Sequence, residues 1–327
     1  MSDTIDIRSI LVPVDGSTLA EQAIPTAIAI AQRTRATLRL ALVHRELHPL
    51  LFVEPGEIYT RTRLALEKAD QDYLSELVQT LRPQLGKALT FALLQGPVAP
   101  TLTKYAKEIG ADLVVMTTHG RGGVRRAWLG SVADELVRTL ELPLILLRPE
   151  EKGSSPQPID LAKIGVSLDG SPLAEAVLDP VLALARVWDS EVLLVQVVRP
   201  ILLTSDPQLL FPTGYADQET RIRQSTAQNY IEEVADRLRA GGVKAGGVAL
   251  LGDAVTDTLL DFFQSEKVGL IAISTHGRGG ARRLVLGSVA DKLVRAAEMP
   301  VLVLRPHTAA RRLRTSRPTT LEHSSSK

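Results

Sequence analysis

The 327-residue chain contains no cysteine, which excludes disulfides, thiolate metal sites and cysteine nucleophiles. Only 4% of its residues are aromatic, so a surface that stacks nucleobases is not expected. Lysine and arginine number 38 against 37 aspartate and glutamate, so the positive excess typical of nucleic-acid-binding proteins is also missing. No apolar run approaches the ~18 to 20 residues of a membrane span, and the N-terminal residues lack the apolar core of a signal peptide. We therefore expect a cytoplasmic protein that binds neither nucleic acid nor membranes.

One segment of the chain occurs twice with few changes. THGRGGVRRAWLGSVADELVR at residues 118–138 returns as THGRGGARRLVLGSVADKLVR at residues 275–295, and the copies differ at four of 21 positions. VPVDGS at residues 12–17 is answered by VSLDGS at residues 166–171, and each half ends on an apolar run before Arg-Pro. A period this long indicates a duplicated domain rather than a solenoid. We divide the chain into domain 1 (1–149), a Gly-, Ser- and Pro-rich linker (150–159), domain 2 (160–306) and a flexible basic tail (307–327).

The hydrophobic pattern is the same in both halves. Short apolar runs alternate with longer amphipathic segments, which is typical of strands and helices that build a parallel sheet. Strands are predicted at residues 9–14, 37–43, 89–94, 113–117 and 144–147, and at 164–168, 191–198, 247–251, 270–274 and 301–304. Helices are predicted at residues 18–33, 61–81, 99–109 and 132–140, and at 172–188, 218–240, 255–266 and 289–297. The fold class is therefore α/β, with two tandem, doubly wound, open parallel-sheet domains of Rossmann-like type and five strands each.

A glycine-rich loop follows the fourth predicted strand of each half. Ligands of such sheets bind beyond the carboxyl ends of the strands, where these loops lie. Gly120 permits close approach of the backbone, and Gly130-Ser131 opens a helix whose N–H groups and dipole favour an anion. Gly277 and Gly287-Ser288 repeat the arrangement. The loops predict a phosphate cradle in each half, and the alternative is a glycine-rich turn with a serine cap and no ligand.

The histidines near these strand ends carry no catalytic or metal signature. His119 and His276 lie inside the loops, but no serine or carboxylate constellation accompanies them, so we interpret them as loop-shaping residues. His44 and His48 are four residues apart, yet the sequence between and after them does not fit His-Glu-x-x-His. We therefore assign no catalytic residue and no metal ligand.

Three motifs together resemble one family. Asp-Gly-Ser after the first strand, the Thr-His-Gly-Arg-Gly-Gly loop and the Leu-Gly-Ser-Val-Ala helix start resemble the universal stress protein family, here as a tandem pair over residues 6–149 and 160–306. The resemblance implies an adenine-nucleotide α-hydrolase-like fold that binds ATP, with Mg²⁺ bridging the phosphates. It also implies a nucleotide-dependent sensor or regulator of the stress response that signals to a protein partner not identified by the sequence. Hydrolysis of ATP, if any, is expected to be slow.

The resemblance also assigns positions of this sequence to the nucleotide. Asp15 and Asp169 would meet the ribose or adenine, and Val43 and Val197 the adenine edge. The remaining positions would hold ribose and phosphates, and they are Thr117, Gly120, Gly130, Ser131 and Val132 in the first half and Ser274, Gly277, Gly287, Ser288 and Val289 in the second.

Two of these positions depart from the family's pattern, which is Gly, two residues, Gly, nine residues, Gly-Ser/Thr. Thr117 and Ser274 stand where its first glycine is expected. A Cβ there would be strained if the backbone required a positive φ. If these residues close the cradle, the alternative is a nucleotide-independent stress protein that acts as a protein-interaction module.

The apolar runs LPLILLR and MPVLVLR that close the two halves would leave exposed sheet edges if each domain stood alone. Pairing them with each other would cover both edges. The resemblance implies the same pairing, since family members dimerise through this strand, and the duplication would then form a pseudo-dimer within one chain. A further homodimer remains open.

Overall fold

The computed structural model describes residues 6–44, 57–120, 129–149, 157–201, 215–275 and 286–306. All ten predicted strands are present, with ends shifted by three residues or fewer. The first half contains β1 (Ser9–Val14), α1 (Thr18–Glu21), α2 (Ile24–Thr34), β2 (Thr37–His44), α3 (Glu57–Leu85), the 3-10 helix η2 (Gly86–Ala88), β3 (Leu89–Gln95), α4 (Val98–Glu108), β4 (Leu113–Thr117), α5 (Ser131–Thr139) and β5 (Leu144–Leu147). The second half contains β6 (Lys163–Ser167), α6 (Pro172–Glu175), α7 (Leu178–Trp188), β7 (Glu191–Val198), α8 (Tyr215–Ala240), β8 (Lys244–Leu251), α9 (Val255–Ser265), β9 (Leu270–Ser274), α10 (Ser288–Ala296) and β10 (Val301–Leu304).

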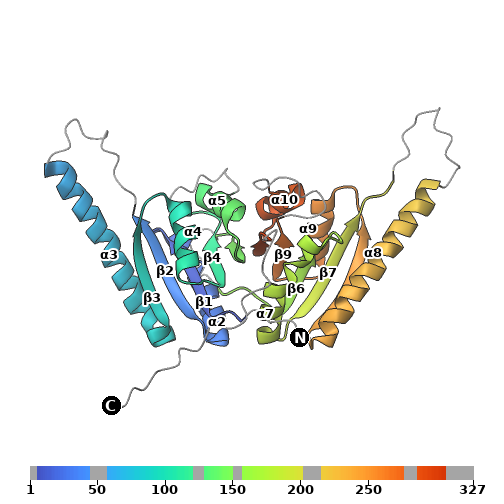
Figure 1. The fold of residues 1–327 in the computed structure, drawn as a ribbon, viewed down its shortest axis with the longest axis horizontal. Helices are drawn as coiled ribbons and strands as arrows, with labels where there is room; N and C mark the ends of the chain where they lie inside the picture. Colours follow the sequence, from blue (N-terminus) through green and yellow to red (C-terminus); the bar gives the residue numbers. More distant parts are fainter. Residues whose placement is uncertain are drawn as a thin grey trace, which may run out of the picture.

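The ten strands form one sheet in the order β3-β2-β1-β4-β5-β10-β9-β6-β7-β8. Neighbouring strands are parallel within each half, whereas β5 and β10 pair antiparallel, with Ile145 opposite Leu302. The two closing strands therefore cover each other's edges, as expected from their apolar sequences. In Figure 1 the halves lie on either side of this junction, with α3 and α8 at the two outer ends.

Helices cover both faces of the sheet. One large apolar cluster joins it to α2, α3, α7 and α8, and a second joins the opposite face to α4, α5, α9 and α10. Along β5 the side chains alternate between these clusters, because Ile145 belongs to the first and Leu144 and Leu146 to the second. Burial on both faces explains why the strands read as continuous apolar runs. Both clusters continue across the β5–β10 junction, so the halves share one core.

The first helix of each half differs from the prediction, because residues 18–33 and 172–188 each form two helices. α1 ends at Glu21 and α2 begins at Ile24, with Pro25 in its first turn. Proline has no N–H for the carbonyl four residues earlier, and its ring collides with that carbonyl. Pro180 plays the same part between α6 and α7, where the carbonyl belongs to Ala176. Ser17 and Ser171 cap α1 and α6, since each hydroxyl accepts a hydrogen bond from the backbone N–H three residues on.

An ion network links α5 to α10 across the junction. Asp134 in the first turn of α5 accepts hydrogen bonds from Arg138 Nε of its own helix at 2.9 Å and from Arg295 of α10 at 2.8 Å. Arg295 also binds Asp291 at 2.9 Å, and Arg305 donates to the carbonyl of Arg138 at 2.6 Å. The hydrogen bond from Arg138, aided by the charges of both arginines, holds the pKa of Asp134 below its ordinary value.

This network predicts a pH-dependent stability. Because the pKa of Asp134 is lower in the folded than in the unfolded protein, its contribution is present above its ordinary pKa of 3.8 and is lost as the pH falls through the folded value. Asp134→Asn should lower the free energy of unfolding at pH 7 by about 1 kcal/mol, since the pairs are partly exposed and screened. Denaturant titrations at pH 7, 5 and 3.5 should show that the difference in free energy of unfolding between wild type and Asp134→Asn becomes smaller at the lowest pH.

Asp291→Asn is the control, because in the described residues Asp291 accepts a hydrogen bond from Arg295 of its own helix and acts on Arg138 of the other half only through the attraction of their charges. It should lower the stability less than Asp134→Asn does. Equal losses of stability in the two variants would contradict a stabilising pair across the junction. A stability difference between wild type and Asp134→Asn that does not change with pH would also contradict it.

Candidate functional site

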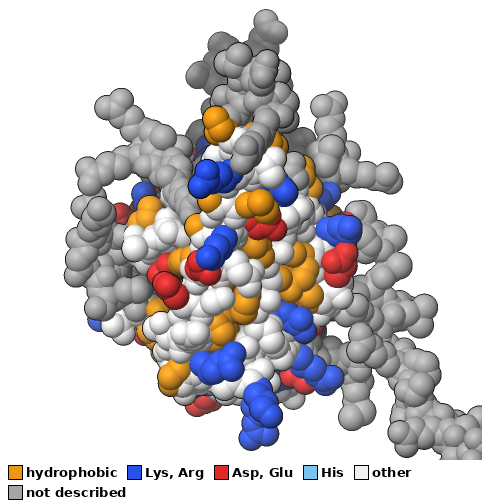
Figure 2. Space-filling view, turned by 90° about the vertical axis from the view of Figure 1, so that its left-hand side faces the viewer, with side chains coloured by type: hydrophobic (Ala, Val, Ile, Leu, Met, Phe, Trp, Pro, Cys, Tyr) orange, Lys and Arg blue, Asp and Glu red, His pale blue; other side chains and the backbone are white. Residues whose placement is uncertain are grey.

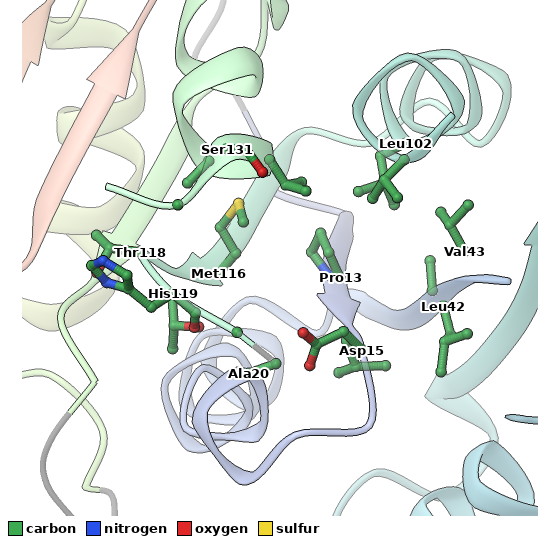
Figure 3. Close-up of a pocket in the computed structure, with 18 of the residues that line it drawn as sticks. Pro13, Asp15, Ala20, Leu42, Val43, Leu102, Met116, Thr118, His119 and Ser131 are labelled. Carbon is green, nitrogen blue, oxygen red and sulfur yellow. The ribbon is translucent and has the colours of Figure 1, made fainter. Parts of the chain in front are cut away.

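A cavity of about 390 Å³ opens at the carboxyl ends of β1, β2 and β4 in the first half. This volume lies within the range of small-molecule sites. Figure 3 shows Pro13 and Asp15 from the end of β1, Leu42 and Val43 from β2, Leu102 from α4 and Ser131 from α5 around it. All seven residues that the sequence assigned to a nucleotide in this half line the cavity, and they are Asp15, Val43, Thr117, Gly120, Gly130, Ser131 and Val132.

The start of α5 forms one wall of the cavity. Gly130 is its N-cap residue, and no side chain caps the helix, whereas Ser17 caps α1. Ser131 is therefore the first helical residue and not a serine cap. The first N–H groups of a helix have no partner within it, and their dipoles favour negative charge. The wall thus presents backbone donors to the cavity.

Gly130 is required by a close approach and not by its backbone angles. Its φ is −66°, which any residue adopts. Its N–H donates to the carbonyl of Thr118 at 2.7 Å, and a Cβ at this position would lie 2.9 Å from the same oxygen. A side chain would therefore push the loop away from the helix start.

Asp15 closes the turn after β1 and also lines the cavity. Its Oδ1 accepts from the N–H of Ser17 at 3.0 Å and from the Ser17 hydroxyl at 2.6 Å. Its carboxylate lies against Gly120, since a Cβ there would lie 2.2 Å from Oδ2. Asp15 thus has a structural role in this turn, and the same carboxylate faces the cavity (Figure 3).

Thr117 and Ser274 end β4 and β9, and their backbones are not strained. In the described part of the chain the non-glycine residues with positive φ are Arg35, Asp189 and Lys267. Neither position requires a positive φ, because both residues continue an extended strand, so the strain considered from the sequence does not arise. The Thr117 hydroxyl donates to the carbonyl of His119 at 2.7 Å, so it is satisfied within the loop.

The second half repeats this backbone arrangement. Asp169 Oδ1 accepts from the N–H of Ser171 at 2.9 Å, as Asp15 does from Ser17. Gly287 precedes Ser288 and Val289 at the start of α10, its N–H donates to the carbonyl of Thr275 at 2.9 Å, and a Cβ there would meet that oxygen at 2.9 Å. Val197 lies in β7 near its carboxyl end. Gly277 lies outside the described residues.

One polar pair in the first cavity was not predicted from the sequence. His44 ends β2, and its Nδ1 lies 2.7 Å from Asp70 Oδ2 of α3. Both residues line the cavity. The sequence pointed to His44 only through its spacing to His48, which lies outside the described residues. The position of His44 directly after a predicted strand was a better signal for a residue of the site. In the described residues no group of three or more His, Asp or Glu side chains is arranged to hold a metal ion.

Charges of both signs occur on the face of the molecule at the α3 end. Figure 2 shows lysine and arginine side chains intermixed with aspartate and glutamate on the end of the molecule that α3 and β3 form. Of the helices in the described ranges, none combines the length and the apolar character needed to cross a membrane.

The sequence model of the universal stress protein family matches residues 6–148 and 161–305. The chain belongs to the universal stress protein family. Universal stress protein Rv1996 of Mycobacterium tuberculosis is 25% identical over 316 residues, which cover 90% of this chain and 94% of that protein. Universal stress protein Rv2005c of the same organism is 27% identical over 215 residues, 63% of this chain, and the match spans just 65% of that relative's length.

Solved structures show that the fold is shared with other universal stress proteins. The crystal structure of a universal stress protein from Archaeoglobus fulgidus superposes with a TM-score of 0.64 over 93% of this chain and 98% of its own, at 14% identity. A putative universal stress protein from Pseudomonas aeruginosa gives a TM-score of 0.61 at 17% identity, over 92% of this chain and 94% of its own. At such identities the likeness concerns the fold alone.

The close contacts at the helix starts of this universal stress protein predict that its stability falls when a side chain is added there. Gly130→Ala and Gly287→Ala should each lower the free energy of unfolding by about 1–3 kcal/mol, because the new Cβ meets a backbone carbonyl that cannot rotate away. Gly246→Ala in β8 is the control, since no atom lies within 4 Å of its Cβ position. Thermal or denaturant unfolding should show that the stability of Gly246→Ala is close to that of wild type. Equal losses of stability in all three variants would mean that the close approach of the carbonyl is not what requires glycine.

Proposed function

We propose that this universal stress protein is a cytoplasmic, nucleotide-dependent sensor or regulator of the stress response. It binds ATP in the first-half cavity and in the matching site of the second half. The observation that carries the proposal is the meeting of three features at one cavity: the uncapped start of α5, the Asp15 carboxylate and an apolar wall. The family resemblance agrees with this assignment. A protein partner of unknown identity would read the bound state.

The phosphates fit the start of α5. Its first-turn N–H groups have no side-chain cap, and Ser131 adds a hydroxyl at the same place. A helix start of this kind is a general site for phosphate. Gly130 and Thr118 hold the loop against the helix, which keeps the donors in place before a ligand arrives. We place Mg²⁺ on the phosphates, because the described residues offer no ligand cluster of their own.

The nucleoside fits the opposite side of the cavity. Carboxylates accept hydrogen bonds, and ribose hydroxyls donate them, so Asp15 is suited to the sugar. Leu42, Val43 and Leu102 offer an apolar surface to a flat base. The second half keeps Asp169 and Val197 in equivalent places, and for this reason we propose a second site there.

Titration calorimetry of ATP into nucleotide-free protein, with and without Mg²⁺, tests the proposal. Wild type should bind ATP at two sites. Gly130→Val and Gly287→Val should each weaken one site at least tenfold, about 1.4 kcal/mol, because the side chain displaces the loop from the helix start. The double variant should lose both. Gly246→Val is the control, and circular dichroism should show that each variant is folded.

Absence of binding at millimolar ATP would overturn the proposal and favour a nucleotide-independent interaction module. Equal affinity in wild type and in the folded double variant would place the nucleotide elsewhere on the molecule.

Turnover should be slow. The two carboxylates of the described cavity wall are engaged by neighbours, Asp15 by Ser17 and Asp70 by His44, so neither is positioned as a dedicated base for water. Phosphate release measured under saturating ATP should stay well below the ~1 s⁻¹ at which ordinary enzymes begin. A rate within the ordinary enzyme range would contradict a binding module.

A further inference from the structure

The two outermost strands of the ten-stranded sheet are β3 and β8 (Figure 1). Each of them therefore has one edge along which the backbone N–H and C=O groups face no neighbouring strand of the sheet. Such an edge is a template for pairing with another chain, and folded proteins usually protect it. The two halves of this protein differ in how they treat this edge.

The edge of β8 is closed by side chains of α8. Gln228 donates to the carbonyl of Gly247 at 3.3 Å and accepts from the N–H of Ala249 at 2.8 Å. Gln224 donates to the carbonyl of Ala249 at 3.0 Å. The backbone groups that a further strand would need are thus already bonded in the middle of this edge.

The equivalent edge of β3 has no such closure. The strand registers of the two halves place Phe91 at the position of Gly247, and Leu93 at that of Ala249. In the part of the chain that the structure describes, no side chain of α3 bonds to the backbone of β3. A Cβ at Gly247 would lie 2.5 Å from Ile231 of α8, so that helix lies very close to its strand. The phenylalanine of the first half excludes an equally close approach of α3.

The sequence of β3 does not protect the edge either. Its residues, LTFALLQ, include no charge and no proline, and its register with β2 contains no bulge. These are the features that usually prevent pairing at an edge strand. After Leu89 every residue of β3 is at least partly exposed, whereas β4 in the interior of the sheet is buried throughout. The first half therefore ends on an accessible, uncharged strand with an open edge.

We propose that β3 pairs antiparallel with β3 of a second copy of this chain, so that two ten-stranded sheets join into one. Alternate residues of a strand turn their backbone groups to the same side, and the equivalence with β8 places those of Phe91 and Leu93 on the open edge. A two-fold register centred on Ala92 pairs all the edge-facing residues from Leu89 to Gln95. Phe91 then exchanges both backbone hydrogen bonds with Leu93 of the second copy, and the two Ala92 residues lie opposite each other on the axis.

A second copy suits this edge because β3 is complementary to itself. Phe91 and Leu93 contribute apolar side chains to one face of the sheet, and Leu94 contributes one to the other face. Antiparallel pairing sets these side chains beside the same apolar side chains and places no like charges opposite each other. It also brings Glu67, which lies at the carboxyl end of β3, to the level of Lys87 of the second copy, just before the start of that strand. The inference is independent of the proposed function, since no residue of β3 lines the cavity.

Sedimentation velocity between about 1 μM and 1 mM protein, the range in which small interfaces associate, tests the proposal. Wild type should pass from one chain to a dimer. Ala92→Lys should weaken the dimer by about fivefold or more, because it sets two like charges directly opposite each other on the axis. An equimolar mixture of Ala92→Lys and Ala92→Glu should restore the dimer, which a variant that had failed to fold could not do.

Val248→Lys is the matched control, since Val248 holds the position of Ala92 on the closed edge of β8, and it should leave the dimer unchanged. Hydrogen exchange should show residues 89–95 gaining protection as the dimer forms. A chain that stays monomeric at about 1 mM would overturn the inference, even if its β3 gained protection with an added extended peptide. A dimer that resists Ala92→Lys, that Val248→Lys weakens equally, or that the mixed charges do not restore would also overturn it.

Discussion

The antiparallel pairing of β5 with β10 is the constraint on which the rest of the molecule depends. Each half ends on a strand that is buried on both faces, and neither strand could be left as an open edge. Pairing them converts two five-stranded sheets into one of ten strands. The apolar clusters on both faces then extend through the junction, and the two halves become parts of one core.

The duplication shows which features both halves share and which belong to one half alone. Gly130 and Gly287 make the same hydrogen bond to the loop at 2.7 and 2.9 Å, and the same space is closed to a Cβ in both halves. By contrast, His44 and Asp70 of the first half correspond to Val198 and Ala227 of the second. The two halves therefore share the backbone at the helix start and differ in the side chains at the end of β2 and β7.

The sequence predicted the central strands well because they are apolar runs buried on both faces, a pattern that does not depend on long-range detail. The edge strand β8 is only partly buried, and its observed start lies three residues before the predicted one. The sequence also predicted helix starts at Val132 and Val289, after the Gly-Ser pair of each half, and the observed helices begin one residue earlier at Ser131 and Ser288. It missed the breaks at Pro25 and Pro180, although each proline lies in the middle of the predicted helix, where the missing N–H and the clash with the carbonyl four residues earlier interrupt a helix. It could not find Asp70, because no local pattern shows which turn of α3 meets the end of β2. The bond between Asp134 and Arg295 was hidden for the same reason, as 161 residues separate the partners.

A crystal structure of the protein grown with ATP would place the ligand relative to both helix starts at once. Phosphate density is expected over the first-turn N–H groups of α5, with the ribose beside Asp15 and the base against Val43. Density for ATP away from the ends of β1, β2 and β4, or a cavity filled by protein side chains at saturating ATP, would contradict it.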